Sequence, residues 1–412
     1  MPSTTSGAIS VVRWRDEPAG RIETRNGGSA GAISGPPRQN LKIVIAGGGT
    51  GGHTSPGLAV AAALAERGVE CVWIGSHHGI EAERVPERGI PFHAIPTGKL
   101  RRYWSWQNVT DLALNVPAGI WRAFGLLGRI RPDAVFATGG FVAVPVVVAA
   151  VLRGQPVVIH EQTAVLGLAN RLTAPLARCV ALTFAGSGAG LPADRRVVTG
   201  NPLREELRGG SRERALVRFE LDATPPLVYV TGGVQGAHRL NRVVGEALPG
   251  LLAAAQVIHQ CGDNRTTGDR GWLQARRAAL PPGLRARYRV VPYVGAELAD
   301  VFAATELVVS RAGAGIVNEC CQLGLPALYI PLPGAGGDEQ TANARLVEAA
   351  GGCVVLPEVA LTAEHLVTTV RQLLAAPARL KEMGERARKL ARPDAASRIA
   401  ELCVQIARGG RP

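Results

Sequence analysis

A glycine-rich stretch near residue 50 combines residue types that could hold an anion and move a proton. Residues 43–53 read Ile-Val-Ile-Ala-Gly-Gly-Gly-Thr-Gly-Gly-His, an apolar run followed by a turn that ends at His53. Glycine lets backbone N–H groups approach a phosphate closely, and the start of a following helix adds partial positive charge. His53 is the only side chain here whose pKa suits proton transfer near neutral pH. The stretch therefore predicts anion binding or proton transfer, with a helix-capping or core histidine as the alternative.

Three glycines of this stretch also fit the dinucleotide-binding pattern G-x-G-x-x-G. A nicotinamide-binding unit should carry, in addition, an acidic residue at the end of its second strand. The expected second strand, near residues 70–75, is followed by Ser76 and His77, and no carboxylate stands at its end. The sequence therefore argues against nicotinamide binding and against an oxidoreductase.

Length and composition limit the remaining classes of protein. A chain of 412 residues, 46% of them hydrophobic, is long enough for two domains with real cores. The net charge of +13 indicates an anionic partner or surface, but no zinc spacing, heptad or aromatic-basic motif points to nucleic acid. The seven cysteines include no C-x-x-C pair, which favours a reducing compartment over a disulfide framework or a zinc site. Residues 1–40 lack an apolar core and are expected to be a disordered extension without a signal peptide.

Short apolar runs alternate with helical stretches along the rest of the chain. Strands are expected near 42–46, 70–75, 92–95, 133–137, 156–160 and 179–182, and again near 227–231, 256–260, 289–291, 306–310, 326–330 and 353–355. This alternation predicts two doubly wound α/β domains facing a cleft, each with a glycine-rich turn after its first strand. Their expected extents are 41–200 and 201–390, followed by a C-terminal helix and tail over 391–412. The uncharged run 134–152 contains Gly139, Gly140 and Pro145, so it is interpreted as strand, turn and helix rather than a membrane span.

Residues 99–131 differ in composition from the rest of the first half. They hold six Lys or Arg against one Asp, and three of the six tryptophans of the chain. Aromatic rings mixed with arginine suit a bilayer interface, where rings enter the lipid and guanidinium groups meet phosphate. We therefore expect this segment to bind an anionic membrane surface, the alternative being an ordinary amphipathic helix packed on the sheet.

Seven motifs occur in one order along the chain. They are Gly47–His53, Thr138-Gly139-Gly140, His160-Glu161-Gln162, Gly200-Asn201-Pro202-Leu203-Arg204, Gly232–Ala237, Arg311–Ala314 with Glu319, and Asp338-Glu339-Gln340 with Asn343. Their order and spacing resemble the MurG family of bacterial UDP-N-acetylglucosamine transferases over roughly residues 41–408. The resemblance implies a GT-B fold, with a lipid-linked acceptor on the N-terminal domain and the nucleotide sugar on the C-terminal domain.

The resemblance also implies the reaction. The muramyl 4-hydroxyl of lipid I would attack C1 of the sugar with inversion as UDP leaves, giving lipid II at the cytoplasmic face of the cell membrane, where the protein would be peripheral. The family implies no metal and no cofactor. A related GT-B enzyme with another nucleotide sugar or lipid acceptor, or a membrane-associated scaffold with weakened catalysis, are the alternatives.

Site residues follow from the resemblance one by one. His53 is expected to be the general base, with Glu161 as its rival. The expected substrate-binding residues are Thr50, Gly51, Gly52, Thr163, Arg204, Val234, Gln235, Val294, Ala314, Glu319 and Gln340. Arg204 would lie near the diphosphate, Glu319 would accept the ribose hydroxyls and a backbone group of Val294 would meet the uracil. Four positions depart from the usual family residues: Thr163 (Asn), Val234 (Ser), Ala312 (Ser) and Ile316 (Thr).

Overall fold

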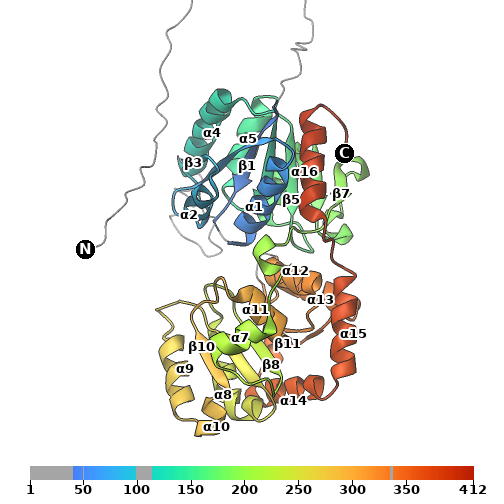
Figure 1. Cartoon of the computed structure of the whole chain (residues 1–412). Helices are drawn as coiled ribbons and strands as arrows, with labels where there is room; N and C mark the ends of the chain where they lie inside the picture. The colour runs from blue at the N-terminus through green and yellow to red at the C-terminus, as the bar shows by residue number, and fades with distance from the viewer. Residues whose placement is uncertain (1–39, 50, 99–113, 335–336) are drawn as a thin grey trace, which may run out of the picture. The chain divides into compact units, whose positions relative to one another are not determined.

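The computed structural model describes residues 40–49, 51–98, 114–334 and 337–412. Within these residues the chain forms two parallel sheets with helices on both faces (Figure 1). The expectation for Thr50 and most of that for the basic aromatic segment, residues 99–113, lie outside the described residues. The fold class predicted from the alternating pattern, two doubly wound α/β units, is confirmed.

The first sheet has seven strands within the described residues, in the order β3-β2-β1-β4-β5-β6-β7. These strands are β1 (Lys42–Gly47), β2 (Glu70–Ser76), β3 (Phe92–Ile95), β4 (Ala134–Gly139), β5 (Val157–Glu161), β6 (Cys179–Leu182) and β7 (Arg196–Val198). Its helices are α1 (Gly51–Ala65), α2 (Glu81–Arg84), α4 (Val116–Ile130), α5 (Ala143–Leu152) and α6 (Leu168–Thr173). Single 3₁₀ turns lie at Pro86–Arg88, Ala174–Leu176, Ala185–Gly188 and Ala193–Arg195.

The second sheet has six strands within the described residues, in the order β10-β9-β8-β11-β12-β13. They are β8 (Leu227–Thr231), β9 (Gln256–Gln260), β10 (Tyr288–Val291), β11 (Thr305–Ser310), β12 (Ala327–Tyr329) and β13 (Cys353–Val355). The helices that precede, join and follow them are α7 (Arg212–Phe219), α8 (His238–Leu252), α9 (Asp269–Ala278), α10 (Pro282–Arg285), α11 (Leu298–Ala304), α12 (Ala314–Leu323), α13 (Glu339–Ala349), α14 (Ala363–Leu374), α15 (Pro377–Arg388) and α16 (Ala395–Ala407). Two 3₁₀ turns lie at Glu205–Leu207 and Glu358–Ala360.

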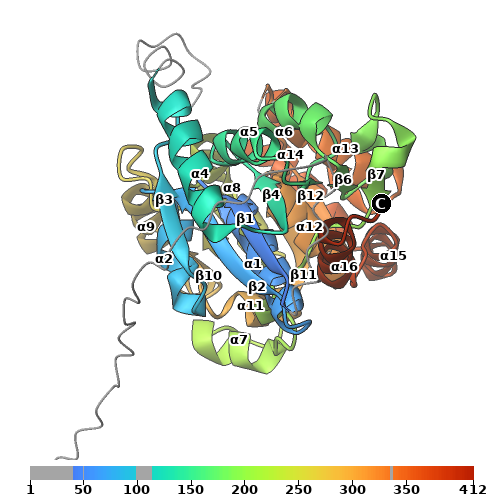
Figure 2. The same cartoon turned by 90° about the horizontal axis from the view of Figure 1, so that it is seen from above.

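Alternate residues of β1 enter opposite cores, because side chains of a strand alternate between the two faces of a sheet. Val44 and Ala46 pack with α4 and α5, whereas Ile43 and Ile45 pack with α1 and α16. Figure 2 shows these two pairs of helices on the two faces of the first sheet. The last helix of the chain, α16, thus completes the core of the first sheet although it follows the second sheet in sequence.

Two details of the first sheet differ from the prediction. β7 was missed, because its three residues begin with the exposed Arg196 and follow a Gly- and Ala-rich stretch. The first helix begins at Gly51, inside the stretch expected to be a turn ending at His53, so Gly51, Gly52 and His53 form its first turn. Glycine is a weak helix former, and nothing local in the sequence indicates that the helix starts there.

The uncharged run 134–152 forms β4, a turn and α5, as predicted. Among the helices of the described ranges, none is long and apolar enough to cross a membrane.

Candidate active site

Both sheets have a topological switch point, where chain connections leave two adjacent strands in opposite directions. In the first sheet it lies between β1 and β4, and in the second between β8 and β11. Ligands of doubly wound sheets bind beyond the carboxyl ends of strands at such points. The two glycine-rich turns follow β1 and β8, so each lies at the switch point of its own sheet.

His53 joins the two strands of the first switch point. Its Nδ1 lies 3.0 Å from the carbonyl oxygen of Thr138, at the end of β4. Gln162 Nε2 lies 3.3 Å from the same Nδ1 but also donates to the Thr138 carbonyl at 3.2 Å. Because a carbonyl only accepts hydrogen bonds, we assign the proton to Nδ1, and the neutral ring then presents Nε2 as an acceptor. Burial lowers the pKa of His53, and the hydrogen bond to Thr138 and the charges of Glu161 and Glu81 oppose this shift. A neutral imidazole with an acceptor nitrogen is the form that a general base requires.

The motif Thr138-Gly139-Gly140 forms the surface against which this imidazole packs. Gly139 and Gly140 have φ angles of +95° and +77°, in a region that glycine adopts readily. A Cβ on Gly139 would lie 3.2 Å from His53 Nδ1, and one on Gly140 would lie 2.7 Å from the carbonyl oxygen of Gly48. A side chain at either position would therefore approach a neighbouring atom too closely and would also strain the backbone.

The buried carboxylate of Glu81, which the sequence did not reveal, binds the first glycine turn through hydrogen bonds. Its Oε2 accepts from the backbone N–H of Gly49 at 2.8 Å, and its Oε1 accepts from the N–H and the hydroxyl of Ser76 at 3.0 and 2.6 Å. The side chain is fully buried, and a Cβ on Gly48 would lie 2.1 Å from its carboxyl carbon. Glu81 therefore fixes the shape of the turn that leads into His53.

Glu161, the rival base, is surrounded by donors. Its Oε1 accepts from the N–H and hydroxyl of Thr163 at 2.9 and 2.7 Å, and its Oε2 accepts from Gly167 N–H and Asn170 Nδ2 at 2.9 Å each. Four hydrogen bonds occupy the usual acceptor sites of a carboxylate. This arrangement suits a residue that shapes the loop after β5 better than one that takes a proton from a substrate. Thr163, one of the four departures, donates to this carboxylate.

The second glycine turn, Gly232–Ala237, is held differently. The N–H of Gly233 donates to the hydroxyl of Thr231 at 3.0 Å, and the N–H of Gly236 donates to the Gly233 carbonyl at 3.1 Å. Val234 and Gln235 are exposed, and their N–H groups make no hydrogen bond to the described residues. Helix α8 begins directly after the turn. Two available N–H groups at the start of a helix form a suitable environment for an anion.

Glu319 lies on α12, the helix that follows β11 at the same switch point. Its Oε1 accepts from Arg204 Nε and Nη2 at 3.1 and 2.7 Å, which brings together two of the predicted residues. Burial raises the pKa of the Glu319 carboxyl, and Arg204 opposes this shift. Within the described residues Glu319 Oε2 accepts no hydrogen bond. That oxygen remains able to accept from a ligand hydroxyl.

Gln260, which the sequence analysis did not single out, connects Val294 to the second turn. Its Oε1 accepts from the N–H of Val294 at 2.9 Å, and its Nε2 donates to the hydroxyl of Thr231 at 3.2 Å. The N–H of Val294 is therefore already bound, and its carbonyl is the backbone group left for a nucleobase. Because Gln260 lies 34 residues before Val294, only the pairing of strands reveals this contact.

Two further predicted residues lie in the first turns of helices at this end of the second sheet. Ala314 is the first residue of α12. Gln340 lies in the first turn of α13, where its Oε1 accepts from the N–H of Leu332 at 3.0 Å and its Nε2 remains as a donor.

Hydrogen bonds connect the loop after β5 with α12 and α13. Asn343 Oδ1 accepts from the N–H of Ala164 at 2.7 Å, and Asn318 Nδ2 lies 3.4 Å from the carbonyl oxygen of Gln162. Gln162 Nε2 also donates to the Thr138 carbonyl at 3.2 Å, beside His53. The loop that Glu161 organises thus contacts both the imidazole and the helices that follow β11 and β12. In the described residues, no group of three or more His, Cys, Asp or Glu could hold a metal ion.

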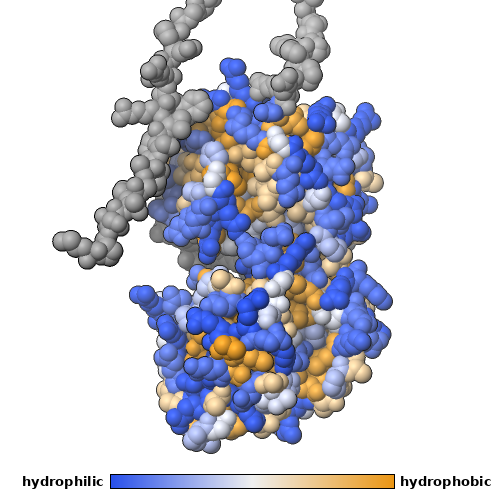
Figure 3. All heavy atoms as spheres, in the orientation of Figure 1, coloured by the Kyte–Doolittle hydropathy of each residue, from blue (hydrophilic) through white to orange (hydrophobic). Residues whose placement is uncertain are grey.

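Apolar side chains are exposed on the helices after β3, β4 and β5. They are Leu114, Trp121, Leu152, Leu168, Leu172 and Leu176. Trp121 is 76% exposed and makes an edge contact with Phe124, over which Arg153 lies at 4.0 Å from the ring centre. Figure 3 shows apolar surface among hydrophilic surface in the region of α4 and α5. The described part of the 99–131 segment therefore combines a packed helix face with an exposed aromatic side chain.

Both halves of the chain match one family of enzymes. Residues 43–182 match the glycosyltransferase family 28 N-terminal domain, and residues 227–399 match the glycosyltransferase family 28 C-terminal domain. Among solved structures, the crystal structure of MurG from Acinetobacter baumannii is similar, with a TM-score of 0.69 and 28% identity, covering 89% of this chain and 99% of that one.

Curated relatives are similar over most of their length. A protein of Geobacillus thermodenitrificans is 38% identical over 338 residues, which are 81% of this chain and 90% of the relative. A protein of Alkalilimnicola ehrlichii is 39% identical over 372 residues, which are 89% of this chain and 99% of the relative. Both are named UDP-N-acetylglucosamine–N-acetylmuramyl-(pentapeptide) pyrophosphoryl-undecaprenol N-acetylglucosamine transferase.

Proposed function

Because the chain belongs to the MurG family of glycosyltransferases, we propose that it transfers N-acetylglucosamine from UDP-N-acetylglucosamine to the undecaprenyl-diphosphate-linked muramyl peptide, lipid I. The product is lipid II, a precursor of peptidoglycan. The observation that carries the proposal is the pair of switch points, one with a neutral imidazole and one with two available N–H groups beside a carboxylate. An acceptor hydroxyl needs the first and a nucleotide sugar needs the second.

Proton removal from the acceptor is assigned to His53 Nε2. The muramyl 4-hydroxyl forms a bond to C1 of the sugar while the bond from C1 to the UDP oxygen breaks, and the hydroxyl proton passes to the imidazole. The Thr138 carbonyl holds the ring in the tautomer that can accept this proton. Glu161, with four hydrogen bonds, keeps the neighbouring loop in shape and is a positioning residue in this scheme.

Binding of the nucleotide is assigned to the second switch point. The N–H groups of Val234 and Gln235 and the start of α12 at Ala314 stabilise the diphosphate as negative charge develops on it. Glu319 Oε2 accepts from the ribose hydroxyls, and Arg204, which already contacts this carboxylate, supplies positive charge beside the diphosphate. The carbonyl of Val294 faces the uracil edge and Gln340 Nε2 binds a sugar hydroxyl. The departure at Val234 removes one side-chain hydroxyl and leaves the backbone donors in place.

We further propose that the protein works peripherally at the cytoplasmic face of the membrane that carries its lipid-linked acceptor. The exposed Trp121 and Leu152, beside Arg122 and Arg129, are suited to the interface of an anionic bilayer. The double substitution Trp121→Ser and Leu152→Ser should reduce binding to phosphatidylglycerol vesicles. Val359→Ser, at an 87% exposed site beyond β13, is the matched control. Equal vesicle binding by both variants would exclude this surface.

The reaction is tested by incubating the purified chain with UDP-N-acetylglucosamine and a short-chain lipid I analogue. The expected products are UDP and a disaccharide-linked lipid whose new bond is β, because displacement at the α-linked donor carbon inverts its configuration. Replacing the donor by UDP-glucose or UDP-N-acetylgalactosamine measures donor choice. Equal transfer from another nucleotide sugar would contradict the assigned donor. UDP binding without any transfer would favour a scaffold.

A further inference from the structure

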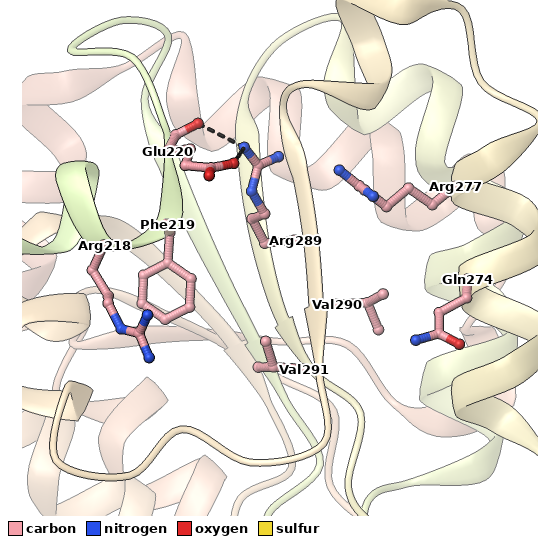
Figure 4. A pocket seen from close by; sticks show the side chains of 8 residues that line it. All are labelled: Arg218, Phe219, Glu220, Gln274, Arg277, Arg289, Val290 and Val291. Atoms are coloured by element: carbon pink, nitrogen blue, oxygen red, sulfur yellow. Dashed lines mark hydrogen bonds and ion pairs between the residues drawn. The ribbon is translucent and has the colours of Figure 1, made fainter.

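A basic hollow lies at the open edge of the second sheet, outside the site described above. The edge is β10, which pairs only with β9 in the described sheet. Side chains from α7, β10 and α9 surround a space of about 370 Å³. In Figure 4, Arg218 and Phe219 lie on one side of the strand, and Gln274 and Arg277 lie on the other.

The backbone of β10 has hydrogen-bonding groups that face this hollow. The carbonyls of Arg287 and Val291 accept from Val257 and Cys261, at the two ends of the pairing with β9. Because backbone groups of a strand alternate in direction, those of residues 288 and 290 face away from β9. The Tyr288 carbonyl accepts from Arg277 Nε at 2.8 Å. The N–H and carbonyl of Val290 make no hydrogen bond to a side chain or another backbone segment within the described residues.

Positive charge is concentrated around this edge. Residues 261–289 contain seven arginines against two aspartates and no glutamate. Arg218, at the end of α7, is 68% exposed, and its Nε and Nη2 donate to Glu297 at 3.3 Å, which leaves Nη1 for a further acid. The single acid lining the hollow, Glu220, is held by Arg289, whose Nη2 lies 2.7 Å from the Glu220 carbonyl oxygen (Figure 4). The edge therefore favours an acidic partner.

We propose that the edge of β10 is a docking site for an extended, acidic segment of a partner protein, which adds to the second sheet as a further strand. The backbone of that segment would pair with the N–H and carbonyl of Val290, and its carboxylates would meet Arg218 and Arg277. Strand addition takes its affinity from main-chain hydrogen bonds and its specificity from side chains, and arginine binds carboxylates through a planar fork.

The geometry favours a peptide over other anionic partners. A lipid surface or a nucleic acid offers phosphates but no alternating backbone donors and acceptors. Charged side chains at sheet edges also serve to prevent strand pairing. Here Arg277 is bound to the Tyr288 carbonyl and Arg289 to Glu220, and neither side chain donates to the carbonyl of Val290. The hollow also has an apolar floor formed by the half-buried Phe219, Val290 and Val291.

The test uses the full chain and a fluorescent eight-residue peptide in which valine and glutamate alternate. Val290→Pro removes the outward N–H and places a ring at the edge, without removing a hydrogen bond to β9. We expect binding of the peptide to weaken by at least about tenfold, because one hydrogen bond is lost and the ring obstructs the approaching strand. UDP affinity and the melting temperature show whether the variant is folded.

Charge is tested separately with Arg218→Gln, which should weaken peptide binding about threefold or more at low salt. Arg379→Gln, an exposed arginine on α15, is the matched control and should leave binding unchanged. A peptide methylated on alternate backbone nitrogens keeps its charge but cannot pair as a strand, so it should bind weakly to every variant.

Four results would overturn the proposal. Equal binding of the methylated peptide, or full binding by Val290→Pro, would show adsorption by charge alone. Loss of binding to phosphatidylglycerol vesicles in the same variants, without peptide binding, would identify a membrane surface. Self-association of the chain that disappears in Val290→Pro, again without peptide binding, would identify a second copy as the occupant.

Discussion

The two glycine-rich turns look alike in sequence and differ in what holds them. The first turn gives the N–H of Gly49 to a buried carboxylate, Glu81, and leads directly into a helix that carries His53 in its first turn. The second turn is held by the hydroxyl of Thr231 and leaves the N–H groups of Val234 and Gln235 without a partner in the described residues. Within the described residues, a carboxylate accepts directly from a backbone N–H of the first turn, and no carboxylate does so in the second turn.

This difference separates two chemical tasks. A carboxylate near an imidazole favours the protonated ring and so supports proton uptake, which suits the site of a base. Backbone donors that no carboxylate occupies are available to a diphosphate. In the proposed scheme, the same glycine pattern therefore serves acceptor activation in one half and donor binding in the other. The predictions below test this division.

The largest effect is expected for His53→Ala. Removing a general base should lower turnover about 10²–10⁴-fold, with UDP affinity nearly intact because the proposed nucleotide site lies on the other sheet. Steady-state turnover and UDP titration measure the two quantities. Glu161→Gln, which keeps part of the loop's hydrogen bonding, should cost less. If Glu161→Gln abolishes turnover and His53→Ala keeps it, the two roles are exchanged.

The same assignment has a pH dependence. Burial lowers the pKa of His53 below its ordinary value of 6.5, so the ring stays neutral and able to accept a proton at a lower pH than a free histidine. Turnover should therefore fall on the acid side only below the ordinary histidine pKa. A plot of turnover against pH with its acid limb above 6.5 would exclude His53 as the base.

The second effect concerns the donor half. Glu319→Ala should weaken UDP binding by about 1.5–3 kcal/mol, the usual cost of a lost hydrogen bond to a charged group. Binding of 2′-deoxy-UDP should weaken much less, because that ligand lacks one of the hydroxyls that Glu319 would accept. Loss of the Glu319 carboxylate also disturbs Arg204, and this disturbance should weaken the binding of both ligands equally. Calorimetric titration of both ligands therefore separates the contribution of ribose recognition from the effect on Arg204. Identical losses would remove Glu319 from the ribose site.

Sequence patterns predicted the elements well and the contacts between distant residues poorly. Apolar runs identified twelve strands, because a strand buried on both faces is continuously apolar. They missed β7, which is three residues long. Glu81 was missed because it lies 32 residues beyond Gly49, and only the pairing of β2 with β1 brings the two together. Sequence also left Glu161 open as a base, since its four hydrogen bonds depend on the folded loop.

The third prediction tests the carboxylate behind the first turn. In Glu81→Gln the amide nitrogen opposes either Gly49 N–H or the Ser76 donors, so a buried donor loses its acceptor. Stability should fall by about 1–3 kcal/mol, measured by urea unfolding. Because Glu81 raises the pKa of His53, the acid limb of turnover should also move to lower pH. Glu83→Gln, exposed on the same helix, is the control. A loss of stability without a shifted pH profile would make Glu81 purely structural.

The smallest effect, and the only expected gain, concerns the second turn. Val234 is 52% exposed beside two available backbone N–H groups, and serine is the usual family residue at its position. Val234→Ser should add one hydrogen bond to the diphosphate and strengthen UDP binding by about 0.5–1.5 kcal/mol. Val234→Thr adds the same hydroxyl to a side chain of nearly unchanged shape, and Val234→Ala removes bulk without adding a donor.

These three variants distinguish a hydrogen bond made by the hydroxyl from the removal of steric crowding at the second turn. A gain in serine and threonine but not in alanine would show that the hydroxyl contacts the diphosphate. A gain in serine and alanine alone would show that the branched side chain merely crowded the ligand. Because backbone donors carry the proposed site, none of the three should change turnover at saturating donor by more than a few fold. The corresponding change in the first turn, Gly49→Ala, has no such tolerance, because a φ of +82° is unfavourable for alanine and Glu81 already holds its N–H.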